Sequence, residues 1–287
     1  MRTQPRSIRE LLRCGEAHLV DNGVPNARKN AEWMLAHVLE RRSTDLYLSP
    51  AETPPADKIG LFDELIRRRG EREPLQYLLG STEFMGLPFV VTPGVFIPRP
   101  DSEALVEKVE QQIGRDGPCA LLDLCCGSGV IAVSLVKRLH GATAVAVDVS
   151  PEAITVAERN AALNEVASEV RVIRSEAMEY LAMSGRQFDL VVCNPPYVPR
   201  PDIPALPPEI RRHEPELSLA GGGDGLDFYR AAMPLLHGVL REDGLVAFEM
   251  GSDQGAAVAD LLRRASFRNI ELHPDYGGSD RFATARA

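Results

Sequence analysis

Leu121-Leu122-Asp123-Leu124-Cys125-Cys126-Gly127-Ser128-Gly129 is the stretch that decides the fold class. Its first four residues are mostly apolar, which is typical of a short buried strand, and the glycines that follow predict a tight turn. Residues 130–139 continue as an apolar run long enough for a helix, and residues 144–148 have the composition of a second strand. Strand, glycine-rich turn, helix and strand in this order predict a doubly wound, parallel α/β sheet.

Acidic residues at the ends of these two strands predict a ligand site. Asp148 follows Gly129 by 19 positions, close to the spacing at which an acid binds the ribose hydroxyls of a nucleotide. The turn is Asp-x-Cys-x-Gly-x-Gly, however, and its aspartate favours an ammonium group over a phosphate. This pattern indicates S-adenosylmethionine as cofactor, with candidate contacts at Asp123, Cys125, Gly127, Gly129 and Asp148. Alternatively, Asp148 only caps the helix that begins at Ser150-Pro151.

A second strand-to-turn motif is Phe188-Asp-Leu-Val-Val-Cys-Asn-Pro-Pro-Tyr-Val-Pro199. The apolar run ends at Asn194-Pro195-Pro196-Tyr197, because prolines lack the N–H of a strand ladder and fix φ near about −65°. Open α/β sheets bind their ligands at the carboxyl ends of strands. We therefore expect Asn194 and Tyr197 to be held stiffly at the site, although a plain strand-to-loop turn is the alternative.

Methyl transfer to a planar, weakly nucleophilic nitrogen suits this corner. The Asn194 side-chain oxygen and the Pro195 carbonyl would accept the two N–H bonds of an amide or exocyclic amino group. The Tyr197 ring would stack on the flat group and favour its developing positive charge. We assign the catalytic roles to Asn194, Pro195 and Tyr197, with rate arising mainly from positioning.

Composition limits the class of protein. The chain has 287 residues, 44% hydrophobic and 25% charged, as in soluble globular proteins. It has no apolar run of the ~18 residues that span a membrane, and its first residues lack the apolar core of a signal peptide. Five cysteines without a C-x-x-C pair favour reduced thiols and a cytoplasmic location. No histidine or cysteine has metal-ligand spacing, so we expect no metal site.

Charge is distributed unevenly. Residues 1–75 carry 13 Lys+Arg and 12 Asp+Glu, whereas the remaining 212 carry 19 and 29. An acidic catalytic region binds a phosphate backbone poorly, so no direct nucleic-acid partner is expected.

Three parts of the chain are predicted. Residues 1–75 have helical periodicity and form a substrate-recognition module, 76–100 form a β-hairpin linker, and 101–287 form the catalytic domain. Glu176, which follows the strand at 170–173, is a candidate for the adenine amino group. The proline- and glycine-rich residues 198–225 are expected to form a wall of the substrate channel.

Motifs along most of the chain together resemble the PrmC/HemK family of release-factor glutamine methyltransferases: Arg72-Glu-Pro-Leu-Gln-Tyr-Leu-Leu-Gly80, Glu83-Phe-Met-Gly-Leu, Ile97-Pro-Arg-Pro-Asp-Ser-Glu103, the Asp123 turn, Asn194-Pro-Pro-Tyr197, Glu214-Pro-Glu-Leu, Asp224-Gly-Leu-Asp-Phe-Tyr and Asp275-Tyr-Gly. The resemblance implies an N-terminal helical bundle joined by a β-hairpin to a Rossmann-like class I methyltransferase domain. It implies methylation of the side-chain amide nitrogen of glutamine in the Gly-Gly-Gln motif of peptide-chain release factors. A monomer is expected.

By this resemblance, Asp123, Gly127 and Asp148 contact S-adenosylmethionine, and Asn194 and Pro195 hold the substrate amide. The resemblance also places Arg99 and Asn194 beside the donor and Phe96 beside the substrate channel. The substrate site is completed by Pro196 and Tyr197. Cys125 stands where the family usually has glycine, and Ser175-Glu176-Ala177 replaces the usual Gly-Asp and bulky residue.

Three alternatives remain at this point. A sister group methylates a glutamine of a large-subunit ribosomal protein, and Arg212-His-Glu-Pro-Glu-Leu217 is similar to that group. An adenine amino methyltransferase acting on nucleic acid uses the same corner, but the acidic catalytic region argues against it. A non-catalytic S-adenosylmethionine-binding protein is disfavoured by the intact Asn-Pro-Pro-Tyr.

Overall fold

The computed structural model describes residues 6–114, 117–185 and 187–287. Residues 1–5, which belong to the predicted module 1–75, lie outside the described residues. The described part of the chain divides into two compact units. The N-terminal unit extends to Gly80 and also contains Pro207–His213, whereas the catalytic unit comprises Ser81–Leu206 and Glu214–Ala287.

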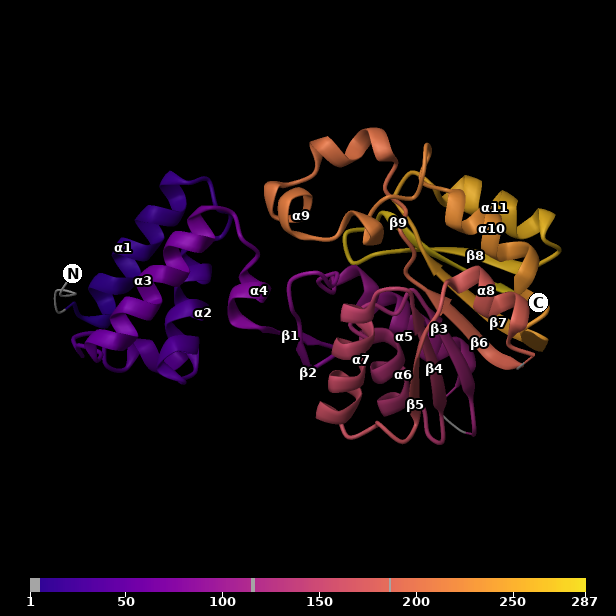
Figure 1. The fold of residues 1–287 in the computed structure, drawn as a ribbon, viewed down its shortest axis with the longest axis horizontal. Coiled ribbons are helices and arrows are strands. Elements are labelled where there is room, and N and C mark those ends of the chain that lie inside the picture. The colour runs from indigo at the N-terminus through magenta and orange to yellow at the C-terminus, as the bar shows by residue number, and fades with distance from the viewer. Residues whose placement is uncertain (1–5, 115–116, 186) are drawn as a thin grey trace. The chain divides into compact units, whose positions relative to one another are not determined.

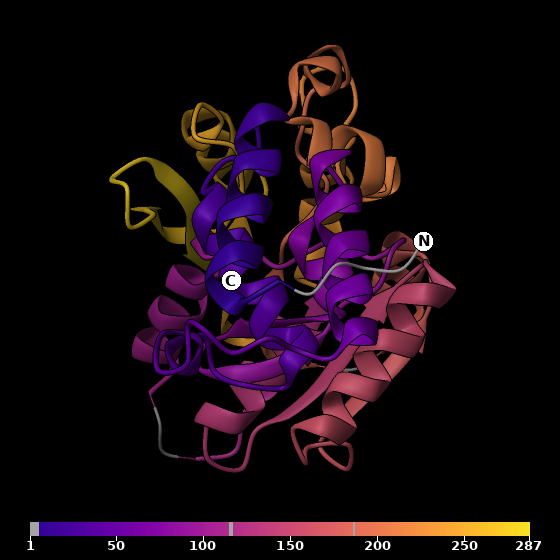
Figure 2. The same ribbon diagram turned by 90° about the vertical axis from the view of Figure 1, so that its left-hand side faces the viewer.

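The N-terminal unit is helical, as its apolar periodicity predicts. Its α1, α2 and α3 are in mutual contact and α4 follows them, with bounds Ile8–Asp21, Ala27–Leu39, Ala56–Gly70 and Leu75–Leu79 (Figures 1 and 2). α1 begins with a capping box, in which the Glu10 carboxylate accepts the Ser7 N–H at 2.8 Å. Packing is tight at Gly15, where an added Cβ would lie 2.9 Å from Ile66 Cδ1. Among the described helices, none is long and apolar enough to cross a membrane.

A short segment from the second half of the chain is part of the same unit. Glu209 on α9 (Pro208–His213) accepts hydrogen bonds from Arg69 at 2.9 Å and from Arg72 at 2.8 and 2.7 Å. The Arg69 side chain is only 5% exposed and also donates to Asn30 Oδ1. Burial raises the pKa of Glu209, but the hydrogen bonds from Arg72 and Arg69 outweigh it and lower that pKa to about 2.

The catalytic unit is built on a mostly parallel sheet, which confirms the predicted fold class. Seven strands of the described chain form it, in the order β5-β4-β3-β6-β7-β9-β8, and β9 runs in the direction opposite to the other six. Their bounds in chain order are Ala120–Leu124 (β3), Thr143–Asp148 (β4), Val170–Arg174 (β5), Phe188–Cys193 (β6), Leu240–Glu249 (β7), Arg268–Pro274 (β8) and Asp280–Arg286 (β9). The strand order reverses at β3, between β4 and β6, so a crevice is expected at the carboxyl ends there.

Helices cover both faces of this sheet because successive strand residues point to opposite sides. Leu121 packs with α5, α6 and α7, whereas Leu122 packs with α8, α10 and α11. The two groups of helices lie on opposite sides of the sheet in Figure 1. Their bounds are Asp101–Ile113 (α5), Val130–Arg138 (α6), Pro151–Leu163 (α7), Ala177–Met183 (α8), Asp227–Leu236 (α10) and Gly255–Arg264 (α11).

The β-hairpin expected within residues 76–100 is present. Its strands β1 (Ser81–Phe84) and β2 (Leu87–Val90) are antiparallel, with Ser81 opposite Val90. Asn160 on α7 holds the hairpin, since it accepts the Val90 N–H at 2.7 Å and donates to the Val90 carbonyl at 3.0 Å. The segment that leads from the hairpin to α5 is thereby anchored to the catalytic unit.

We expect Glu209→Ala to lower the free energy of unfolding of the N-terminal unit by about 2 kcal/mol, because it leaves the buried Arg69 guanidinium with unsatisfied donors. Glu209 has a folded-state pKa below its unfolded value of 4.5. The difference in the free energy of unfolding between parent and variant therefore has its full value above pH 4.5 and becomes smaller as the pH falls toward about 2.

Denaturant unfolding and hydrogen exchange of residues 208–213 measure this effect. Glu216→Ala, at an exposed carboxylate of the same loop, is the control and should match the parent. Unchanged exchange in Glu209→Ala would contradict the anchoring role.

Candidate functional site

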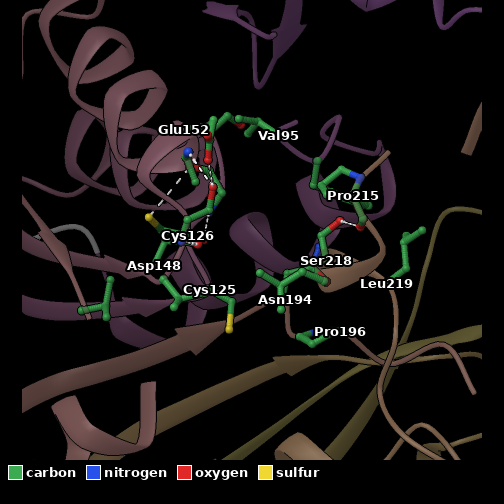
Figure 3. A pocket seen from close by; sticks show the side chains of 18 of the residues that line it. Val95, Cys125, Cys126, Asp148, Glu152, Asn194, Pro196, Pro215, Ser218 and Leu219 are labelled. Carbon is green, nitrogen blue, oxygen red and sulfur yellow. Dashed lines mark hydrogen bonds between the residues drawn. The ribbon is translucent and has the colours of Figure 1, made fainter. Parts of the chain in front are cut away.

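A cavity of about 940 Å³ lies at the carboxyl ends of the central strands of the catalytic unit. Segments that follow β3, β4, β5 and β6 line it, together with the residues before α5 and the returning loop after α9. Figure 3 shows labelled side chains from several of these segments around a common space. The sequence-predicted residues among the lining are Phe96, Cys125, Gly127, Asp148, Glu176, Asn194, Pro196 and Tyr197. Asp123, Gly129, Pro195 and Arg99 lie outside this lining.

The turn after β3 has a left-handed backbone at alternate positions. Cys125 has φ 56°, Gly127 φ 54° and Gly129 φ 77°. A non-glycine residue in this region costs about 1 kcal/mol, so Cys125 adds backbone strain to the turn. Gly127 has open space where a Cβ would be, whereas a Cβ on Gly129 would lie 3.1 Å from Ala157 Cβ. Gly127 thus opens the backbone to the cavity, and Gly129 lets α6 and α7 pack closely.

Asp148 ties two of the strand ends together. Its Oδ2 accepts the Gly127 N–H at 2.8 Å and its Oδ1 accepts the Ser150 N–H at 2.9 Å. The helix after it is capped instead by the Ser150 hydroxyl, which accepts the Ala153 N–H at 3.2 Å. Each carboxylate oxygen keeps a further lone pair, so Asp148 holds the turn and also offers acceptors to the cavity that it lines.

Asp123 is fully buried at the end of β3. Its Oδ2 accepts the Ala132 N–H at 3.0 Å, while its Oδ1 has no hydrogen-bond partner among the described residues. Burial, with a smaller contribution from the nearby Asp148 carboxylate, raises the pKa of Asp123 to about 8, although the hydrogen bond from the Ala132 N–H lowers it. A buried acceptor without a partner is costly, so this oxygen is suited to a cationic ligand group.

Glu176 caps a helix. Its Oε2 accepts the N–H groups of Met178 at 2.7 Å and Glu179 at 3.0 Å, at the start of α8. The residue lines the cavity, but one carboxylate oxygen is occupied by this cap. A contact to adenine remains a prediction that involves the other oxygen.

The Asn-Pro-Pro-Tyr corner belongs to a buried hydrogen-bond network. Asn194 Nδ2 donates to Ser102 Oγ at 3.3 Å, and Ser102 donates in turn to Glu249 Oε2. The Tyr197 hydroxyl donates to Glu249 Oε1 at 3.3 Å, and its carbonyl accepts from Gln254 at 2.8 Å. This network fixes the Asn194 amide and the Tyr197 ring at the cavity wall.

Arg99 is linked to the cavity only through its contact with Phe96. Its guanidinium forms an ion pair with the buried Glu214 carboxylate and lies 4.9 Å from the centre of the Phe96 ring. Phe96 lines the cavity, whereas Arg99 does not. Arg99 therefore holds Phe96 and the returning loop in place, and a direct contact to the donor remains a prediction.

Several lining residues were not predicted individually. Ser102 is one, and Glu152 on α7 and the returning segment with Pro215, Leu217, Ser218 and Leu219 are others. Glu152 could have been predicted to line the cavity from its position in the sequence, shortly after Asp148 and the second strand. Residues 198–225 contribute Val198 and this returning segment, as expected of a channel wall. The described residues contain no cluster of three or more side chains suited to a metal ion.

Comparison with known proteins identifies the family. Residues 10–80 match the PrmC N-terminal domain and residues 86–203 match the methyltransferase small domain. A release factor glutamine methyltransferase of Geobacter sulfurreducens is 39% identical over 98% of this chain and 96% of its own. One from Moorella thermoacetica is 41% identical over 96% of both chains.

The chain belongs to the release factor glutamine methyltransferase family. A further relative, a release factor glutamine methyltransferase of Bacillus anthracis, is 36% identical over 97% of this chain and 98% of its own. Among solved structures, a methyltransferase from Pyrococcus furiosus has a TM-score of 0.51 at 16% identity and covers 71% of this chain and 89% of its own. That likeness supports the methyltransferase fold of the catalytic unit.

We expect Asp123→Asn to stabilise the ligand-free protein at pH 8 by on the order of a few kcal/mol. The pKa of Asp123 rises from 3.8 to about 8 on folding, so its ionisation destabilises the parent increasingly as the pH rises through that interval. Asparagine keeps an acceptor for Ala132 without this charge.

Denaturant unfolding at pH 4 and pH 8 measures the effect, which should be small at the lower pH. Asp148→Asn is the matched control and should be destabilised, because its amide nitrogen would face a backbone N–H. If the stability of Asp123→Asn relative to the parent is the same at pH 4 and pH 8, the raised pKa assigned to the buried Asp123 carboxyl is contradicted.

Proposed function

We propose that this chain transfers a methyl group from S-adenosylmethionine to the side-chain amide nitrogen of glutamine in the Gly-Gly-Gln motif of a peptide-chain release factor. Relatives that carry the name release factor glutamine methyltransferase align with nearly the whole chain, and this alignment carries the proposal. The Asn194 corner at the cavity supplies the chemistry that such a substrate requires.

The residues around the cavity fit S-adenosylmethionine. Asp148 lines the cavity and offers acceptors for the ribose hydroxyls. Asp123 lies behind this lining, at the end of β3, and its unpartnered Oδ1 is suited to the ammonium group. Val149 and Ala177 give the cavity an apolar wall, on which an adenine ring would pack. When bound, the cofactor supplies an electrophilic methyl group on a positively charged sulfur.

The chain's own residues orient the nucleophile. A glutamine amide has two N–H donors and a delocalised lone pair, so it needs acceptors that hold it rather than a base that deprotonates it. We assign the Asn194 side-chain oxygen and the Pro195 carbonyl as these acceptors, with Tyr197 and Pro196 against the flat face of the amide. As the N–CH₃ bond forms and the donor's S–CH₃ bond breaks, positive charge develops on the nitrogen, and the Tyr197 ring favours that charge. The nitrogen then releases one of its two protons to water. Phe96 borders the path of the substrate side chain.

The test is transfer of labelled methyl from S-adenosylmethionine to a purified release factor, beside a variant with Gly-Gly-Ala in place of Gly-Gly-Gln. We expect label on the parent factor alone, at the glutamine by mass spectrometry. Label on neither factor would overturn the proposed substrate, and a large-subunit ribosomal protein would be tested next.

We expect Asn194→Ala to lower the turnover number about 100-fold while the dissociation constant for S-adenosylmethionine stays within a factor of two. The loss arises because an acceptor that positions the amide is removed, whereas the donor contacts remain. Single-turnover kinetics measure the first quantity and calorimetry the second. Equal losses in both would show that Asn194 only supports the cavity.

A further inference from the structure

The buried pair of Ser102 and Glu249 decides which way the Asn194 amide faces. Ser102 is 2% exposed and lies in the first turn of α5, and Glu249 is 1% exposed at the end of β7. Ser102 bridges the Asn194 amide and the Glu249 carboxylate.

The direction of each hydrogen bond follows from the number of protons. An ionised carboxylate only accepts, so the single hydroxyl proton of Ser102 is committed to Glu249. Ser102 Oγ then presents only lone pairs to Asn194. The Asn194 group that complements them is its NH₂, which lies 3.3 Å away. The amide oxygen of Asn194 is left for the cavity that the residue lines.

We propose that Glu249, acting through Ser102, is a positioning residue that turns the Asn194 oxygen toward the substrate amide. This inference rests on the proposed function, since it takes the Asn194 oxygen as the acceptor for the glutamine N–H. Protonation of Glu249 reverses the arrangement. A protonated carboxyl donates to Ser102, Ser102 then donates to Asn194, and the Asn194 NH₂ faces the N–H donors of the substrate.

The surroundings of Glu249 allow this protonation near neutral pH. Burial raises the pKa of Glu249 to about 7, against the hydrogen bonds from Ser102 and Tyr197, which lower it. Asp101 on α5 raises that pKa and Arg281 on β9 lowers it. From α10, the Tyr229 hydroxyl donates at 2.6 Å to the backbone carbonyl of Glu249 rather than to the carboxylate. The active form is the ionised one, so turnover should rise with pH through about 7.

A double-mutant cycle tests the route through Asn194. We expect Ser102→Ala to lower the turnover number about 10-fold with unchanged affinity for S-adenosylmethionine, because one orienting hydrogen bond is lost. In the Asn194→Ala background the same change should have little further effect, since the group it orients is absent. The matched control is Ser134→Ala, which should have the turnover of the parent. Ser134 is also buried on a helix, but its hydroxyl has no hydrogen-bond partner among the described residues.

The pH profile supplies the second readout. The rise in turnover near pH 7 should be present in the parent and absent from Glu249→Gln and Ser102→Ala. A rise that persists in both variants, or losses that add fully in the double mutant, would overturn the inference. If Asn194→Ala itself retains parental turnover, the assigned role of Asn194 fails instead, and if the parent does not methylate release factor, the proposed function fails.

Discussion

The parallel register of β3 with β4 and β6 is the constraint on which the site depends. Leu124 lies opposite Val147 on one side and Cys193 on the other. The residues just past these partners therefore emerge at one edge of the sheet, which brings Cys125, Asp148 and Asn194 to one cavity. A slip of one residue would exchange the faces of a strand and bury the wrong side chains, so the apolar alternation that packs both layers of helices also aligns the site.

Buried polar groups then give this edge its chemistry at a cost in stability. Asp123 keeps an unpartnered carboxylate oxygen, and Glu249 is a carboxyl whose burial raises its pKa to about 7. Cys125 adds a strained left-handed backbone at the turn. The hairpin held by Asn160 and the helices packed on both faces of the sheet offset these costs. Such a distribution is expected where function requires groups that the fold alone would not select.

Local patterns in the sequence were enough to predict the sheet class, the hairpin and several cavity residues. Asp148 and Asn194 could be predicted because each lies at the end of an apolar strand. The order of strands and helices brings the carboxyl ends of these strands together. What the sequence did not show are partners distant along the chain. Ser102 and Glu249 are separated by 147 positions, and Arg72 and Glu209 by 137. The assignment of Pro207–His213 to the N-terminal unit and the network behind Asn194 follow from those pairs. Neither has a local signature.

The most direct measurement is a crystal structure of the protein with S-adenosylhomocysteine and a peptide that contains Gly-Gly-Gln. The account predicts that the glutamine amide nitrogen donates to Asn194 Oδ1 and to the Pro195 carbonyl, while Asn194 Nδ2 stays on Ser102. A glutamine amide bound away from Asn194, or an Asn194 whose NH₂ faces the peptide, would contradict it.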